Sequence, residues 1–174
     1  ADMGASATAA RFMTAFYAAT AGTDITVDGC ERLRRRPIGP LVDALRRLGA
    51  DIEYRGADGF LPVAIRGRRL SGGEVDLDAS ASSQFASGLA MIAPTMENPL
   101  RIALGGEIAS MPYLKMTMDM LRARGVETDR EGYTITVANT PLRPVEAEAE
   151  ADWSAAAFWY QIAVSYTHLT LPTK

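Results

Sequence analysis

A repeat within the chain constrains its fold more than any other feature of the sequence. The segment 43–51 reads Asp-Ala-Leu-Arg-Arg-Leu-Gly-Ala-Asp, and the segment 119–127, 76 positions later, reads Asp-Met-Leu-Arg-Ala-Arg-Gly-Val-Glu. Each is typical of a helix that ends at a glycine, and each leads into two strand-like segments. This helix ending is common by itself, but self-similarity at a fixed offset predicts a fold built from copies of one α/β unit.

The spacing of apolar residues predicts helices and strands that alternate along the chain. Helices are expected at 5–18, after Pro37 up to Gly49, at 82–93, near Pro112 up to Gly125, and from Asp152 onward. Strands are expected at 23–28, 51–54, 61–66, 74–77, 100–104, 126–129 and 133–138. This order predicts an α/β (α+β) fold.

Composition narrows the class of protein. The 174 residues, 48% hydrophobic and 22% charged, are ordinary for one soluble domain. The apolar runs are much shorter than a membrane-spanning helix, which needs roughly 20 residues. The first residues lack a secretory signal, so we expect a cytoplasmic protein. The net charge of −3 gives no sign of a nucleic-acid-binding surface.

Few residues are available for metal or redox chemistry. Cys30 is the only cysteine, which excludes an internal disulfide and a clustered thiolate site, and we expect it to be a small buried side chain. His168 is the only histidine, so sites built on histidine lack their ligands. We therefore expect neither a metal nor a cofactor.

One segment gathers positive charge directly before a predicted helix. Residues 32–36 read Arg-Leu-Arg-Arg-Arg, and Pro37 follows them. Guanidinium groups match the geometry of phosphate and carboxylate, and a helix N-terminus adds backbone donors. The segment is therefore a candidate anion site, although a solvated basic face is the more common meaning of such a cluster.

Two further segments place polar groups at the start of a predicted helix. Ser82, Ser83 and Gln84 crowd the start of one apolar helix, and Ser110 and Tyr113 stand at the start of the next. Hydroxyl and amide groups donate well to phosphate oxygens, together with the amides of the helix. Taken alone, each segment is explained more simply as a helix cap.

In order and spacing, these segments resemble the hallmark segments of the EPSP synthase family. The resemblance rests on 36–45, 82–85 and 110–113, supported by 8–12 and by an acidic segment at 150–156, and it covers 4–163. Three agreeing segments are far more specific than any one of them. The resemblance implies repeated βαβαββ units of the enolpyruvyl transferase fold (the inverted α/β prism), with this chain as one incomplete domain of two.

The family transfers the enolpyruvyl (1-carboxyvinyl) group of phosphoenolpyruvate (PEP) to the 5-hydroxyl of shikimate 3-phosphate in aromatic amino-acid biosynthesis, and phosphate is released. By the resemblance, the residues that hold shikimate 3-phosphate are Ser82, Ser83, Gln84, Ser110 and Tyr113. Those that border PEP are Arg36, Gln84, Ala7 and Thr8. Arg11 belongs to the same motif as Thr8, without an assigned role.

Catalysis by this chain alone is not expected. By the resemblance, the carboxylates and basic residues that transfer protons and clamp PEP belong to segments outside the chain, so we assign no catalytic residue. The parent enzyme would be a monomer that binds two small anions and neither nucleic acid nor membrane. Ala7 stands where the family motif has glycine, and its methyl group would crowd the PEP pocket, so we expect the inhibitor glyphosate, which occupies that pocket, to bind more weakly than in relatives that carry glycine.

The resemblance also divides the chain. Residues 1–151 would form most of the domain that binds shikimate 3-phosphate, and residues 152–163 would begin the following unit. Residues 164–174 break the family pattern in the middle of a helix and resemble a translated sequencing adapter, which fold reasoning should exclude.

Two alternatives stay open. The first is the related enolpyruvyl transferase that acts on UDP-N-acetylglucosamine, which commonly uses a catalytic cysteine, whereas Cys30 lies in no matching motif. The second is a non-catalytic domain that binds anions.

Overall fold

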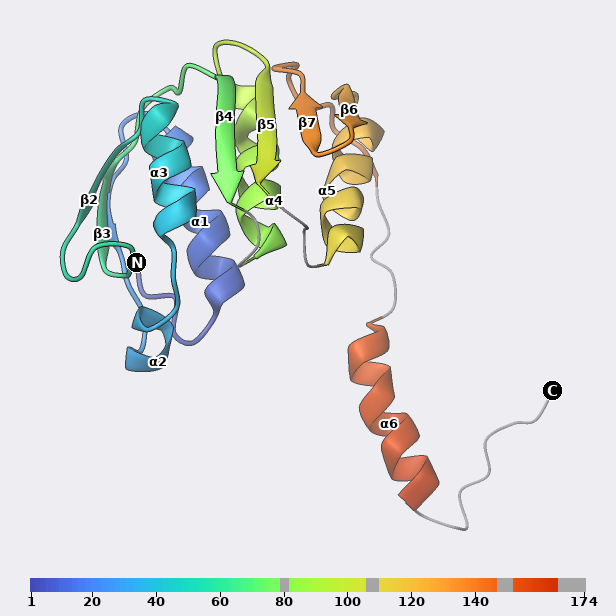
Figure 1. The fold of residues 1–174 in the computed structure, drawn as a ribbon. Helices are drawn as coiled ribbons and strands as arrows, with labels where there is room; N and C mark the ends of the chain where they lie inside the picture. The colour runs from blue at the N-terminus through green and yellow to red at the C-terminus, as the bar shows by residue number, and fades with distance from the viewer. Residues whose placement is uncertain (79–81, 106–109, 147–151, 166–174) are drawn as a thin grey trace. The chain divides into compact units, whose positions relative to one another are not determined.

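The structure is a computed structural model that describes residues 1–78, 82–105, 110–146 and 152–165 (Figure 1). The chain divides into two compact units, 1–144 and 145–174.

The first half of the larger unit is a three-stranded antiparallel sheet with helices. Its strands are ordered β1-β3-β2, so the last strand in sequence lies in the middle. The elements are α1 (Ala7–Ala19), β1 (Asp24–Val27), α2 (Glu31–Arg34), α3 (Gly39–Arg47), β2 (Asp51–Tyr54) and β3 (Val63–Arg66).

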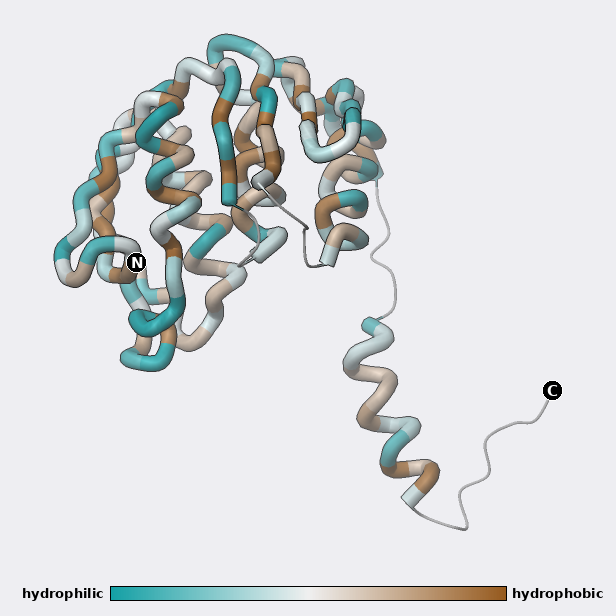
Figure 2. Tube along the Cα trace, viewed as in Figure 1, coloured by the Kyte–Doolittle hydropathy of each residue, from teal (hydrophilic) through white to brown (hydrophobic). Residues whose placement is uncertain are grey.

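The second half of this unit has a four-stranded mixed sheet, ordered β4-β5-β7-β6. Strands β4 and β5 are parallel, and the other pairs are antiparallel. The elements are β4 (Gly73–Asp78), α4 (Ser83–Ile92), the 3₁₀ turn η1 (Ala93–Thr95), β5 (Leu100–Gly105), α5 (Met111–Ala123), β6 (Thr128–Glu131) and β7 (Thr134–Val137). In Figure 2, β4 and β5 alternate between apolar and polar residues, as expected for strands with one buried face.

The two halves repeat one unit, as the sequence predicts. Helix α1, strand β1, helix α3 and strands β2 and β3 follow in the same order as α4, β5, α5, β6 and β7. Gly49 and Gly125 both adopt left-handed backbone angles, with φ of 98° and 82°. The next residue in each copy donates its N–H to the carbonyl five residues back, at 2.9 Å from Ala50 and 3.1 Å from Val126. Glycine therefore ends both helices with the same cap.

An arginine clip follows the same repeat. Arg46 donates from Nε and Nη2 to the carbonyl oxygen of Ile52, at 3.0 and 2.7 Å. Arg122, the residue 76 positions later, donates from the same two atoms to the carbonyl oxygen of Thr128, at 3.2 and 3.0 Å. Each arginine thus ties the end of its helix to the strand that follows, which explains part of the sequence similarity between the copies.

The helices of this unit start at one end. In Figure 1, α1, α3, α4 and α5 all begin at the lower end, where the arrowheads of β4 and β5 also point. Helix α4 packs against both α1 and α5, and Thr117 Oγ1 of α5 lies 3.1 Å from Ser87 Oγ of α4 in a buried hydrogen bond. The largest fully buried side chains of the core include Leu41, Leu45, Ile65, Leu77, Phe85, Leu89, Ile102 and Leu114.

The smaller unit contains helix α6 (Trp153–Ser165). Asp152 caps its start, because its Oδ1 accepts hydrogen bonds from the N–H groups of Ser154 and Ala155. The proposed adapter-derived tail falls largely on 166–174, which lie outside the described residues. In the part of the chain that the structure describes, no helix is both long and apolar enough to cross a membrane.

Most predicted elements are present within a few residues of their expected bounds, but two expectations are wrong. Helix α2 was not expected, because its four residues are too few to show a helical period. Cys30 is exposed and not buried. Cys30 directly precedes α2, in a connection on the surface. No apolar layer covers its side chain there.

One arginine of the cluster at 32–36 stabilises the fold. Arg34 of α2 forms a bidentate pair with Asp28, in which its Nε lies 2.8 Å from Oδ1. The N–H of Gly29 also donates to Asp28. The hydrogen bond from Arg34 is the largest cause that lowers the pKa of the Asp28 carboxyl, and the opposite effect of burial is smaller. Arg34 therefore fixes α2 to the end of β1.

We expect the substitution Arg46→Met to lower the free energy of unfolding by about 1 kcal/mol, since it removes two hydrogen bonds to a backbone carbonyl. The neighbouring Arg47→Met is the matched control. Arg47 is exposed, and among the described residues its side chain forms an ion pair with Asp76 at 3.7 Å, which contributes little in water. Urea unfolding of both variants measures the difference, and equal midpoints would show that the clip does not stabilise the fold.

Removal of the Asp28 charge should change the pH dependence of stability. Because the pKa of Asp28 is lowered in the folded state, its stabilisation is fully present above the unfolded value of about 3.9 and is lost as pH falls through the lower folded value. Asp28→Asn should therefore be less stable than wild type at pH 7, and the two should converge once pH falls below the lowered folded pKa of Asp28. Thermal unfolding across this range measures the effect, with Asp129→Asn on β6 as a control; a constant gap would contradict the assignment.

Candidate functional site

Arg11 is at the centre of the polar residues near the helix starts. It belongs to α1, and only 9% of the residue is exposed. Its Nη1 donates to Ser82 Oγ at 3.0 Å and to Gln84 Oε1 at 2.8 Å, and its Nη2 lies 3.5 Å from the carbonyl oxygen of Pro37. The guanidinium carbon lies 4.8 Å from the centre of the Phe85 ring, a favourable cation–π contact. One side chain thus joins α1, α4 and the approach to α3.

Gln84 and Ser82 complete this network. Gln84 Nε2 donates to Thr8 Oγ1 at 2.8 Å, so the first turns of α1 and α4 are joined directly. Ser82 precedes α4, and its Oγ accepts the N–H of Gln84 at 3.2 Å. Ser82 is therefore a helix cap as well as a partner of Arg11.

Arg36 is the member of the arginine cluster that faces this network. Arg34 pairs with Asp28 and Arg35 pairs with Glu31, whereas the guanidinium of Arg36 forms no ion pair or hydrogen bond with any residue that the structure describes. Arg36 and Arg11 both line a narrow cleft, which they share with Ala7, Ala10, Leu33, Pro37, Ile38 and Leu61.

The electrostatics of the cleft favour an anion. Burial is the larger cause that lowers the pKa of Arg11, and the positive charge of Arg36 lowers it further. Arginine nevertheless stays protonated in proteins. Within the described ranges, no carboxylate forms an ion pair with either residue. The two cations therefore repel each other, and an anion between or beside them would relieve this repulsion.

The start of α3 contributes less than the sequence suggests. The N–H groups of Ile38 and Gly39 both donate to the carbonyl oxygen of Gly59, at 2.9 and 3.1 Å. The next residue, Pro40, has no N–H, and Leu41 donates to Ile38. The first backbone donors of α3 are thus occupied within the chain and do not face an anion beside Arg36. In this segment, the guanidinium of Arg36 is therefore the group that would attract an anion.

Ser83, Ser110 and Tyr113 lie at the same end of the fold. Ser83 is the first residue of α4 and is buried. Ser110 and Tyr113 are exposed at the start of α5, which packs beside α4. Among the described residues, the structure records no hydrogen bond between them and the Arg11 network. Ser110 has a left-handed backbone with φ of 68°, and its side chain does not cap the helix. Such a conformation costs energy for any residue except glycine and is most frequent at functional sites.

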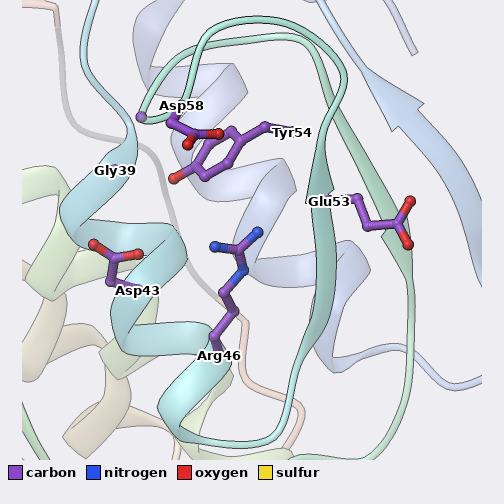
Figure 3. Close-up of a pocket in the computed structure, with 7 residues that line it drawn as sticks. Gly39, Asp43, Arg46, Glu53, Tyr54 and Asp58 are labelled. Atoms are coloured by element: carbon purple, nitrogen blue, oxygen red, sulfur yellow. The ribbon is translucent and has the colours of Figure 1, made fainter.

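A second hollow is lined by residues of α3, β2 and the loop after β2 (Figure 3) and has a volume of about 710 Å³. The hydroxyl end of Tyr54 points between Asp43 and Asp58, and the guanidinium of Arg46 lies beside the Tyr54 ring, 4.9 Å from its centre. Burial, followed by the charge of Asp43, raises the pKa of Tyr54. The acidic lining does not suit an anion, and Arg46 is already bound to Ile52.

Sequence reasoning missed the partners of Arg11. The carbonyl of Pro37 and the ring of Phe85 hold its guanidinium, but they lie 26 and 74 positions away in the sequence, with no pattern that links them. The one available signal was a charged residue within an otherwise apolar helix. In the described part of the chain, no three side chains of His, Cys, Asp or Glu lie close enough together to hold a metal.

Comparison with known proteins connects this chain to one family. The sequence profile of EPSP synthase (3-phosphoshikimate 1-carboxyvinyltransferase) matches residues 1–169. A 3-phosphoshikimate 1-carboxyvinyltransferase of Bacteroides fragilis (strain YCH46) is 44% identical over 163 residues, which are 93% of this chain and 40% of that protein. One from Korarchaeum cryptofilum is 40% identical, over 90% of this chain and 37% of that protein.

Solved structures agree with this match and confirm the fold expected from the resemblance. EPSP synthase from Acinetobacter baumannii has a TM-score of 0.75 and 29% identity, over 93% of this chain and 35% of that one. The enolpyruvyl transferase NikO from Streptomyces tendae, at 19% identity and a TM-score of 0.52 over 78% of this chain and 31% of that one, shares the fold. The chain spans about 40% of the length of the Bacteroides relative. It belongs to the EPSP synthase family.

Proposed function

We propose that this chain supplies the shikimate 3-phosphate site and one wall of the PEP site of a parent 3-phosphoshikimate 1-carboxyvinyltransferase. The observation that carries the proposal is the pair of guanidinium groups, Arg11 and Arg36, which no carboxylate of the described residues neutralises. Both of the proposed substrates carry a phosphate, and a cleft of this charge favours such an anion.

The residues divide between the two substrates. The shikimate 3-phosphate site is proposed to consist of Ser82, Ser83, Gln84, Ser110 and Tyr113. The wall of the PEP site is proposed to consist of Arg36, Gln84, Ala7 and Thr8. Gln84 belongs to both sets, which fits its position between Thr8 of α1 and the start of α4.

The complete reaction is proposed only for the parent protein, a cytoplasmic monomer in this reading. Transfer of the enolpyruvyl group requires charged groups that close around both anions and a hydroxyl positioned for attack. The chain spans about 40% of the Bacteroides relative, so residues outside it would supply the rest of the site. We propose that the chain alone binds substrate but does not turn it over.

Of the two alternatives, the relatives disfavour the transferase that acts on UDP-N-acetylglucosamine, because the curated relatives described above are named for 3-phosphoshikimate. The non-catalytic anion-binding domain is separated from the proposal by ligand choice. It would bind inorganic phosphate as tightly as shikimate 3-phosphate, whereas the proposed site would prefer the latter.

Substitution of Ser82 tests whether its hydroxyl binds substrate or only caps α4. Ser6 is its counterpart in the repeat, since its Oγ caps α1 by accepting the N–H of Ala9 at 3.2 Å. Ser6→Ala and Ser82→Ala should each lower stability by about 1 kcal/mol through loss of a cap. In calorimetric titration with shikimate 3-phosphate, only Ser82→Ala should weaken binding, by roughly tenfold. Equal affinity of both variants would limit Ser82 to capping.

Two substitutions of Ser110 distinguish the cost of its left-handed backbone from the contribution of its hydroxyl to binding. Ser110→Gly should raise the free energy of unfolding by about 0.5–1 kcal/mol, because glycine adopts a left-handed backbone without a steric cost. Ser110→Ala should not, since alanine keeps that cost. Both variants lose the hydroxyl and should bind shikimate 3-phosphate more weakly, by the same factor. Thermal unfolding and calorimetry measure the two effects; unchanged affinity in both would remove Ser110 from the site.

A further inference from the structure

The hydrogen-bonding chemistry of Arg11 determines the orientation of the Gln84 side-chain amide. A guanidinium group donates hydrogen bonds and cannot accept them. Arg11 Nη1 lies 2.8 Å from one end of the Gln84 amide, so that end must be the oxygen. The NH₂ end must then point away from Arg11, toward Thr8. One of its two hydrogens binds Thr8 Oγ1, and the other has no acceptor among the described residues.

The same reasoning applies to the Ser82 hydroxyl. A serine oxygen has two lone pairs and one hydrogen. The lone pairs accept Arg11 Nη1 at 3.0 Å and the N–H of Gln84 at 3.2 Å. Both acceptor positions are filled, so the hydroxyl can only donate its hydrogen elsewhere, and no described residue accepts it.

We infer that Arg11 is a positioning residue that turns the Ser82 hydroxyl and the Gln84 amide into hydrogen-bond donors directed at a bound phosphate ester. Arg11 itself is nearly buried, over the Phe85 ring and beside the carbonyl of Pro37. It therefore acts through its neighbours. The inference rests on the proposed function, because shikimate 3-phosphate is the ligand that these donors would meet.

The physical benefit is preorganisation. Donors that already face the ligand need no rearrangement when it binds, which strengthens binding of a charged group in a partly desolvated site. Without Arg11, the Gln84 amide could rotate by half a turn, or, if the amide kept its orientation, the Ser82 hydrogen could turn toward the Gln84 oxygen. Lone pairs would then face the phosphate and repel it.

Nuclear magnetic resonance tests the orientation without any ligand. In the ¹⁵N-labelled chain, the side-chain NH₂ hydrogens of Gln84 should show nuclear Overhauser contacts to Thr8. Arg11→Met should abolish them, whereas Arg11→Lys, which still donates to the Gln84 oxygen, should retain them. Absence of the contacts in the wild-type chain would overturn the inference, whether or not the chain binds shikimate 3-phosphate.

A double-mutant cycle tests the effect on binding. Ser82→Ala should weaken the affinity for shikimate 3-phosphate by a factor at least about fivefold larger in the wild-type background than in Arg11→Met, because the hydroxyl is directed only when Arg11 is present. Arg122→Met is the matched control, since it loses an arginine clip outside the site. In that background the effect of Ser82→Ala should equal the wild-type effect.

The two experiments separate the inference from the proposed function. Equal effects of Ser82→Ala with and without Arg11 would reduce Arg11 to a structural role and overturn the inference. No binding by the wild-type chain, combined with the expected contacts between Gln84 and Thr8, would refute the proposed ligand and leave the orienting role of Arg11 supported.

Discussion

The candidate site depends on the placement of one buried cation. Arg11 joins the starts of α1 and α4 and the segment before α3 through Ser82, Gln84 and Pro37. Burial of a charge is costly unless it is well hydrogen-bonded, and here neutral oxygens and an aromatic ring hold it in place of a carboxylate. Its positive charge is therefore left available to the cleft, where Arg36 adds a second one.

The repeat explains why such a site forms at this end. Both copies place a helix start next to the end of a strand, and packing of α4 between α1 and α5 brings these starts together. The partial positive charge at the starts of α1 and α4 adds to that of the arginines. This arrangement lowers the stability of the fold locally, because Arg11 and Arg36 repel each other and because Ser110 has a left-handed backbone. Features of this kind are expected where a ligand supplies the compensating interaction.

The sequence predicted much of the fold and a smaller part of the site. Helices, strands and the glycine caps at Gly49 and Gly125 were predictable, because apolar periodicity and glycine act over a few neighbouring residues. The segment that contains Ser82 was predictable for the same reason. The family resemblance selected Arg36 from its cluster, but the pairing of Arg34 and Arg35 with Asp28 and Glu31 was not predictable, because it depends on how α2 folds beside the end of β1. Nor did the sequence show that Gly59 occupies the first amides of α3.

The sequence by itself thus determined the repeated α/β unit, the positions of the helix starts and the residues that resemble the EPSP synthase family. Only the tertiary structure decided which of these residues act together. Arg11 and its partners Ser82 and Gln84 are 71 and 73 positions apart, and their contact exists because α1 packs on α4. The direction of each hydrogen bond follows from that contact, since a donor-only group fixes the polarity of the neighbours it touches.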